Sequence, residues 1–319
     1  MNSLLSRFAE NSLWIARYIE RAENLARILD VNETFARDEQ GASNWLPILQ
    51  LHQDEKRFAG RYRTVDAANV VRFYILDDQN PNSISCCVRA ARENARSIRH
   101  LISLETWTQL NVFYNWVASL NRRHVNLNDL SRLCARIKEG CQLHYGIVNG
   151  TLYRDQIWSF YRLGTFIELC DQTTRLVDIK YHSLLPQHED VGKPIDVAQW
   201  NAVLRSASAY HGYRRVYPHE MTPRTVASFI LLDLRFPRSV THCAWQIGHA
   251  VEGLLQNADL ERVNFAPAAL DGLSELAAWD IERIIGFGMH EYLDQVQLRL
   301  IELSEAIDET FFLSRYSAA

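Results

Sequence analysis

The N-terminal part of the chain reads Leu5-Ser-Arg-Phe-Ala-Glu-Asn-Ser-Leu-Trp-Ile-Ala-Arg-Tyr-Ile-Glu-Arg-Ala-Glu-Asn-Leu-Ala-Arg-Ile-Leu-Asp-Val31. Stepped at about 100° per residue, this stretch forms a helix with two different faces. One face is an apolar arc that is wide enough to pack on a core. Its members are Phe8, Ile15, Tyr18, Ile19, Ala22, Ala26 and Leu29. The sequence therefore predicts one long helix that ends near Arg37 and organises the rest of the fold.

The opposite arc of this helix is charged and polar. Its members are Glu10, Arg17, Glu20, Arg21, Glu23, Asn24 and Arg27. Glu23 precedes Arg27 by four residues, the favourable order for a helical ion pair, and such a face is typical of a solvated surface. However, Leu13, Ile28 and Val31 lie in the same arc, and a solvated face has no need of them. A second packed layer, or a partner, is the competing interpretation.

The composition indicates a globular protein built from helices. Of the 319 residues, 47% are hydrophobic, which is enough for one large domain or two smaller ones. Only 13 residues are Gly and 8 are Pro, so strands joined by tight hairpins are not expected. We therefore predict an all-α protein that forms a single large helical bundle.

Acidic and basic residues are nearly balanced. The 34 Lys and Arg and 38 Asp and Glu give a net charge of −4, so no global field would attract nucleic acid or an anionic membrane. No uncharged apolar run is long enough for a membrane helix, and Glu10 and Arg17 interrupt the only candidate signal peptide. These features predict a cytoplasmic protein that binds neither nucleic acid nor a membrane.

Cap residues and glycines place the other helix boundaries. Thr64 is expected to cap one helix, and Asn80, before Pro81, the next. Later helices are expected to begin at Ser103, Asn126, Thr222 and Pro237. A break at Gly146 and Gly150 should precede a long helix over about 151–182, and further helices are expected over 200–210, 267–285 and 289–312. The clearest loop is 186–194.

The chain contains an internal repeat. A shift of 148 residues places Tyr18-Ile-Glu20 on Phe166-Ile-Glu168, and also matches Glu23 with Asp171, Arg27 with Arg175 and Asp30 with Asp178. A shift of 156 residues matches Pro81, Ser83 and Cys87 with Pro237, Ser239 and Cys243. We infer one domain, 1–319, built from two duplicated halves, 1–145 and 148–319, about a pseudo-twofold axis.

The second half has lost much of the charge of the first. Glu20-Arg21 corresponds to Glu168-Leu169. The counterparts of Arg89, Arg92, Glu93 and Arg96 are Trp245, Gly248, His249 and Glu252. A functional face assembled mainly from the first half is therefore expected.

Motifs for self-sufficient catalysis are absent from the sequence. No Glu is followed three residues later by His, and no Asp-x-x-x-Asp pair occurs, which excludes ferritin-like di-iron proteins and isoprenoid synthases. There is no Gly-x-Ser-x-Gly, Walker A or Gly-rich dinucleotide loop. The six cysteines have no CxxC or zinc spacing and predict reduced, mostly buried thiols, and His242 and His249 are interpreted as core groups. We expect no metal and no cofactor.

The charges of the first half form the candidate site. They are Glu10, Arg17, Glu20, Arg21, Asn24, Arg89, Arg92, Glu93 and Arg96, on two helices that we expect to be neighbours. Because buried charges persist only when paired, the cluster could be a structural ion-pair network. Arg also binds carboxylates and phosphates, so a pocket for an acidic peptide or a phosphate is a second interpretation, and catalysis by a Glu is a third.

Several stretches, in order along nearly the whole chain, carry a family resemblance. They are Ser6-Arg7 with Glu20-Arg21-Ala22-Glu23-Asn24 and Leu29-Asp30-Val31, then Pro81-Asn-Ser83, Arg89-Ala-Ala-Arg-Glu-Asn-Ala-Arg96, Leu152-Tyr-Arg-Asp-Gln-Ile-Trp158 and Phe236-Pro-Arg-Ser-Val240. In these stretches the chain resembles the alpha-E family of bacterial all-helical proteins, named for a Glu-Arg motif. Leu169 departs from the family pattern, in which a second Glu-Arg-like motif is expected.

The resemblance implies an accessory or scaffold role. Proteins of this kind are associated with a circularly permuted ATP-grasp ligase, a transglutaminase-like peptidase and sometimes a proteasome-like hydrolase, in peptide synthesis or tagging. The alternative is an enzyme in its own right, acting on amide or phosphate bonds through Glu20, Glu93 and the arginines. Whether the chain forms a homo-oligomer stays open.

Overall fold

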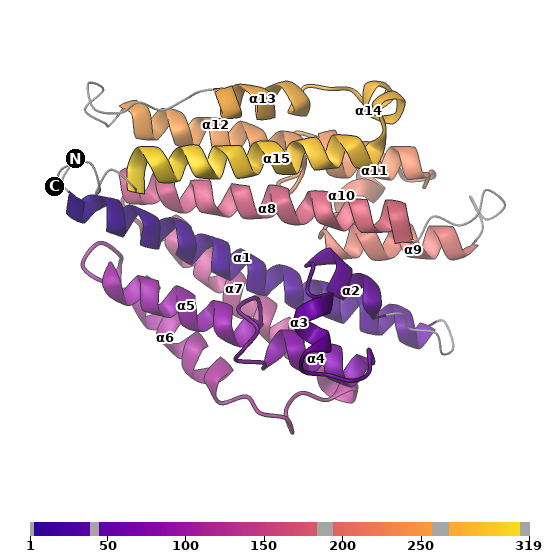
Figure 1. Cartoon of the computed structure of the whole chain (residues 1–319), viewed down its shortest axis with the longest axis horizontal. Coiled ribbons are helices and arrows are strands. Elements are labelled where there is room, and N and C mark those ends of the chain that lie inside the picture. The colour runs from indigo at the N-terminus through magenta and orange to yellow at the C-terminus, as the bar shows by residue number, and fades with distance from the viewer. Residues whose placement is uncertain (1–2, 39–44, 184–193, 257–267, 313–319) are drawn as a thin grey trace. The chain divides into compact units, whose positions relative to one another are not determined.

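The computed structural model describes residues 3–38, 45–183, 194–256 and 268–312, and in these ranges every regular element is helical (Figure 1). The prediction of an all-α protein is confirmed. No helix within the described ranges is long and apolar enough to cross a membrane.

The chain divides into two compact units, each assembled from separate segments. Unit 1 comprises Met1–Arg17, Tyr153–Tyr181 and His211–Ala319, and unit 2 comprises Tyr18–Leu152 and His182–Tyr210. Helix α1 (Ser3–Asp38) contributes its first turns to unit 1 and the rest to unit 2. The division into halves 1–145 and 148–319 stays a prediction.

Unit 2 is built on the later part of α1. Its other elements are α2 (Leu46–Leu51), α3 (Glu55–Ala59), α4 (Ala67–Ile75), α5 (Ile84–Ser97), α6 (Leu104–Ala118), the 3-10 turn η1 (Leu127–Asp129), α7 (Leu130–Thr151) and α9 (Pro194–Ser206). Helix α6 packs against both α5 and α7. Tyr74, Phe73 and Leu25 are among the largest fully buried side chains.

Unit 1 is built on α8 (Gln156–Ser183). Its other elements are α10 (Tyr210–Val216), α11 (Pro223–Leu232), α12 (Val240–Gln256), α13 (Ala268–Ala277), α14 (Ile281–Phe287), α15 (Met289–Ile307) and the π-helical turn η3 (Asp308–Phe312). Helix α13 packs against both α12 and α15 (Figure 1). Tyr213 and Tyr292 are fully buried.

Both arcs of α1 are covered. Leu13 and Ile28 are buried, and so are Glu20, Glu23 and Asn24. A second packed layer on the polar arc is therefore confirmed, and the interpretation of a solvated face is wrong for these residues.

A glycine brings α8 close to α1 within unit 1. A Cβ added at Gly164 would lie 2.2 Å from the carbonyl oxygen of Leu13. On the same pair of helices, Ser12 Oγ donates a 2.8 Å hydrogen bond to the carbonyl of Ile157. This close approach of the two backbones depends on the missing side chain.

The predicted caps at Ser103 and Thr222 are confirmed, since each side chain accepts a hydrogen bond from the amide three residues later. Helix α4 is capped by Asp66, not Thr64, and α5 by Ser83, not Asn80. Thr64 instead donates to Asp66.

Other boundaries also differ from the prediction, among them α9, which spans Pro194–Ser206 rather than 200–210, and α12, which begins at Val240 rather than Pro237. Gly146 and Gly150 lie inside α7, and α8 begins only at Gln156. The predicted helix 267–285 is divided into α13 and α14 because Asp280 caps a new helix. Most of the predicted loop 186–194 lies outside the described residues.

Candidate functional site

The predicted site residues lie in three places. The first is the start of α1, in unit 1. Glu10 is exposed there, whereas Arg17 Nε donates a 3.0 Å hydrogen bond to Glu168 Oε2, and the Glu168 side chain is fully buried. The Arg17 guanidinium also lies 4.8 Å from the centroid of the Trp14 ring. Arg17 and Glu168 thus form a buried ion pair, and we interpret its role as structural.

The second place is the middle of α1, in unit 2, where Glu20, Glu23 and Asn24 are buried. Glu23 pairs with Arg27 and accepts a 3.3 Å hydrogen bond from Gln142 Nε2 of α7. Burial raises the pKa of the neighbouring Cys141 thiol well above its ordinary value, and the charges of Glu23 and Glu20 raise it further. The thiol is therefore protonated and unsuited to nucleophilic attack.

All six cysteines are free and buried, which confirms the prediction of buried thiols. The pKa values of Cys134 and Cys170 are also raised, and burial is the largest cause for both thiols.

Arg21 connects two of the stretches that carry the family resemblance. Its Nη1 donates a 3.2 Å hydrogen bond to Asn82 Oδ1, in the turn before α5. The turn is fixed from inside, because Asn80 Oδ1 accepts the Asn82 amide at 3.0 Å.

A buried carboxylate, Asp54, lies beside Asn82 of this turn. Asp54 is fully buried and pairs with Arg57, and the side chains of Asn82 and Tyr74 lie near its carboxylate. The pKa of Asp54 is raised above its ordinary value, because burial raises it more than these neighbours lower it. The Glu-Arg region is thus part of a hydrogen-bonded network that ties α1 to the loops around it.

The third place is α5, where the arginines reach towards α6 and solvent. Arg92 Nε donates a 3.0 Å hydrogen bond to Asn111 Oδ1, and its guanidinium lies 5.1 Å from the Tyr114 ring centroid. Arg96 pairs with Glu93 at 2.7 Å on the surface. Arg89 donates to Cys86 Sγ at 3.2 Å.

A groove opens between α6 and α7 rather than at the Glu-Arg region. Its volume is about 630 Å³. Leu104, Val112 and Leu143 line it, and between 57% and 70% of each residue is exposed. Arg136 and Glu139 supply charge of both signs. The groove is an apolar surface of a kind that marks contacts with other proteins.

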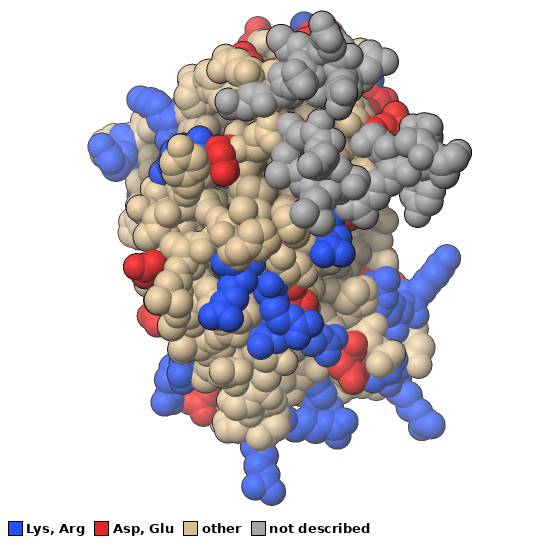
Figure 2. Space-filling view, turned by 90° about the vertical axis from the view of Figure 1, so that its left-hand side faces the viewer, with Lys and Arg blue, Asp and Glu red and all other residues tan. Residues whose placement is uncertain are grey.

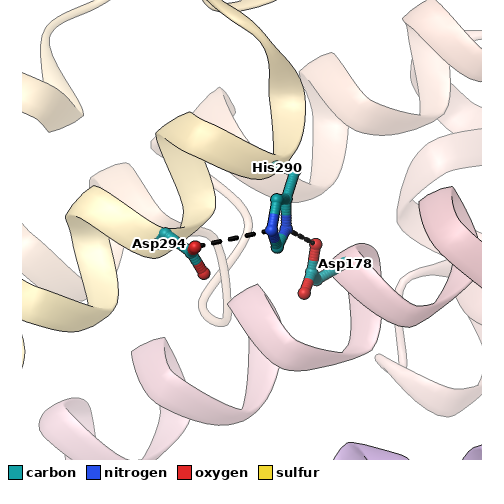
Figure 3. Close-up of side chains that lie close together, drawn as sticks. All are labelled: Asp178, His290 and Asp294. Atoms are coloured by element: carbon teal, nitrogen blue, oxygen red, sulfur yellow. Dashed lines mark hydrogen bonds and ion pairs between the residues drawn. The ribbon is translucent and has the colours of Figure 1, made fainter.

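Two helices of unit 1 bring together a histidine and two aspartates (Figure 3). His290 Nδ1 lies 2.8 Å from Asp178 Oδ1 of α8, and His290 Nε2 lies 3.5 Å from Asp294 Oδ2 one turn along α15. The hydrogen bond to Asp178 is the main cause of a raised His290 pKa. Sequence reasoning missed this group, because Asp178 and His290 are 112 residues apart and form no motif.

The histidines of α12 are differently placed. His242 Nδ1 lies 2.8 Å from the carbonyl of Leu234, but His249 is exposed and contacts Glu252. The interpretation as core groups is therefore wrong for His249, and His242 is only half-buried. Trp245, 51% exposed, stacks edge-on against His249.

Charges of both signs occur on the surface. On the face drawn in Figure 2, Lys and Arg side chains gather over the middle and lower part, and Asp and Glu are sparser there.

Comparison with protein families gives one match. Residues 4–312 match the Alpha-E model, described as a predicted alpha-helical domain with a conserved ER motif. Comparisons with curated proteins and with solved structures find no match.

Proposed function

The chain belongs to the Alpha-E family, and on that premise we propose that it is a non-catalytic helical partner of an ATP-grasp-type peptide ligase. In this role it would act with a transglutaminase-like peptidase in peptide synthesis or tagging. Because a ligase of this class consumes ATP, we place the pair in the cytoplasm.

The observation that carries the proposal is the burial of the Glu-Arg region. Glu20 is 7% exposed and Glu23 is 5% exposed, and their neighbours on α7 include a protonated thiol. An enzyme that acts on amide or phosphate bonds needs its carboxylate within reach of the substrate. The burial of these carboxylates supports a structural role for the motif and leaves recognition to the surface.

The groove between α6 and α7 is the surface that we propose for the ligase. Exposed leucine and valine side chains at its rim would lose contact with water on binding, which is favourable. Arg136 and Glu139 could orient the partner by pairing with single charges of opposite sign on its surface, so the partner would need no large net charge.

Co-purification with the products of neighbouring genes tests the proposal. We expect a stable complex with an ATP-grasp-type chain. If that chain is encoded alongside and never co-purifies, the proposal fails. If the purified protein alone hydrolyses amide or phosphate bonds and Glu20→Gln abolishes this activity, the enzyme alternative is correct.

We also propose that the two halves arose by duplication. Supporting this, caps lie 156 residues apart at Asp66 and Thr222, and again at Ser83 and Ser239. Ion pairs at Glu23–Arg27 and Asp171–Arg175 lie 148 residues apart. The pseudo-twofold arrangement stays a prediction.

A further inference from the structure

The cluster of Asp178, His290 and Asp294 has the residue types of a metal site. Each side chain offers one ligand atom, and these atoms lie within 4.8 Å of one another. The side chains come from two helices of the same unit, α8 and α15, and point towards one another (Figure 3). All three are at least partly exposed, so an ion could reach them from solvent.

A corresponding group exists in unit 2 but cannot bind a metal. Lys138 Nζ of α7 lies 2.7 Å from Asp30 Oδ2 of α1. Asp30 is the repeat counterpart of Asp178, and a shift of 152 residues places Lys138 on His290. The same shift places the buried Ile137, Cys141 and Val148 on the buried Met289, Leu293 and Leu300.

Two replacements distinguish the groups. Where the first half has Lys138, a fixed cation that cannot ligate at neutral pH, the second has the imidazole of His290. Where the first half has the amide of Gln142, the second has the carboxylate of Asp294. Both replacements turn a non-ligand into a metal ligand.

The balance of charge also changes. Glu139 has its counterpart in Glu291, so the second half keeps this acidic residue, gains Asp294 and loses the lysine. A cation between Asp178 and Asp294 would restore the compensation that Lys138 provides in the first half.

We propose that Asp178, His290 and Asp294 bind a first-row divalent transition metal, with Zn²⁺ or Mn²⁺ as the probe ion. This inference rests on the proposed duplication. One imidazole nitrogen and two carboxylates suit these ions, whereas Mg²⁺ and Ca²⁺ prefer oxygen ligands alone. Binding would fix α15 to α8 at one end.

Calorimetric titration of the EDTA-treated full chain at pH 7.5 tests the site. We expect one equivalent of Zn²⁺ or Mn²⁺ to bind, and the melting temperature to rise with metal. The variant His290→Lys with Asp294→Gln restores the first-half residues, so it should keep its fold without metal and bind at least tenfold more weakly.

The matched control changes the exposed pair on α12 in the same way, His249→Lys with Glu252→Gln, and should bind like the wild type. Absence of binding, or equal binding by wild type and the His290→Lys, Asp294→Gln variant, would overturn the proposal. So would loss of binding in the α12 control alone. Since neither variant touches the α6–α7 groove, a negative result leaves the ligase proposal standing.

Discussion

At the scale of single residues, ion pairs differ in what they contribute according to burial. Removing one partner of a buried pair leaves the other charge without compensation, whereas an exposed charge is solvated by water. Arg17 and Glu168 are an example of the first kind, and Arg132 and Asp129 of the second.

We predict that Arg17→Ala lowers the free energy of unfolding by about 3 kcal/mol, because Glu168 would stay buried without its guanidinium partner. Arg132→Ala, whose pair is largely exposed, should cost less than about 1 kcal/mol. Urea unfolding of both variants measures the difference, and equal losses would contradict the structural role of the Arg17 pair.

A buried histidine makes stability depend on pH. His144 is fully buried, and burial lowers its pKa to about 4. Since its pKa in the unfolded chain is near 6.5, protons bind the unfolded state preferentially below that pH, and stability falls as pH drops from about 6.5 towards 4.

Between pH 7.5 and pH 5 this site should remove about 2 kcal/mol of stability. Urea unfolding at both pH values, with His144→Gln as the comparison, isolates the contribution because other groups titrate in both proteins. If the variant loses as much stability as the wild type, His144 is not the titrating group.

At the scale of elements, glycines have opposite roles in two helices. A Cβ at Gly164 of α8 would meet the backbone of Leu13, whereas nothing lies within 4 Å of one at Gly146 of α7. Gly164→Ala should therefore destabilise the protein by several kcal/mol. Gly146→Ala should stabilise it by up to about 1 kcal/mol. Thermal unfolding checks both signs, and a neutral Gly164→Ala would show that α1 and α8 are not closely packed there.

Helix boundaries show what the sequence could and could not predict. Ser103 and Thr222 were predicted correctly, and at Thr222 the following Pro223 marks the first helical position. Thr64 and Asn80 failed because Asp66 and Ser83, two and three residues later, also have cap side chains. Asn80 is used instead to hold the turn, donating to the carbonyl of Phe73.

The residue types of the candidate site were predictable from the sequence, but the burial and the partners of its side chains were not. Periodicity placed Glu20 on a charged face, but only packing decides that Glu20 is buried and that Arg92 reaches Asn111 of α6. The group around His290 had no signal in spacing, because its ligands come from helices far apart in the chain.

At the scale of the whole molecule, we propose that the Glu-Arg region is structural and that the groove between α6 and α7 is the surface that binds the ligase. Arg21 connects α1 to the turn at Asn82, and Val112 lies exposed in the groove between α6 and α7. The two roles predict different consequences for stability and for partner binding.

The most direct test is the affinity of the purified ATP-grasp-type ligase for Val112→Glu and Arg21→Ala, measured beside the wild type at a temperature where all three are folded. We predict that Val112→Glu keeps its melting temperature but binds at least tenfold more weakly. Arg21→Ala should melt at a lower temperature and bind with unchanged affinity. If Arg21→Ala is stable yet loses the ligase while Val112→Glu binds normally, the Glu-Arg region is the functional surface and the account is wrong.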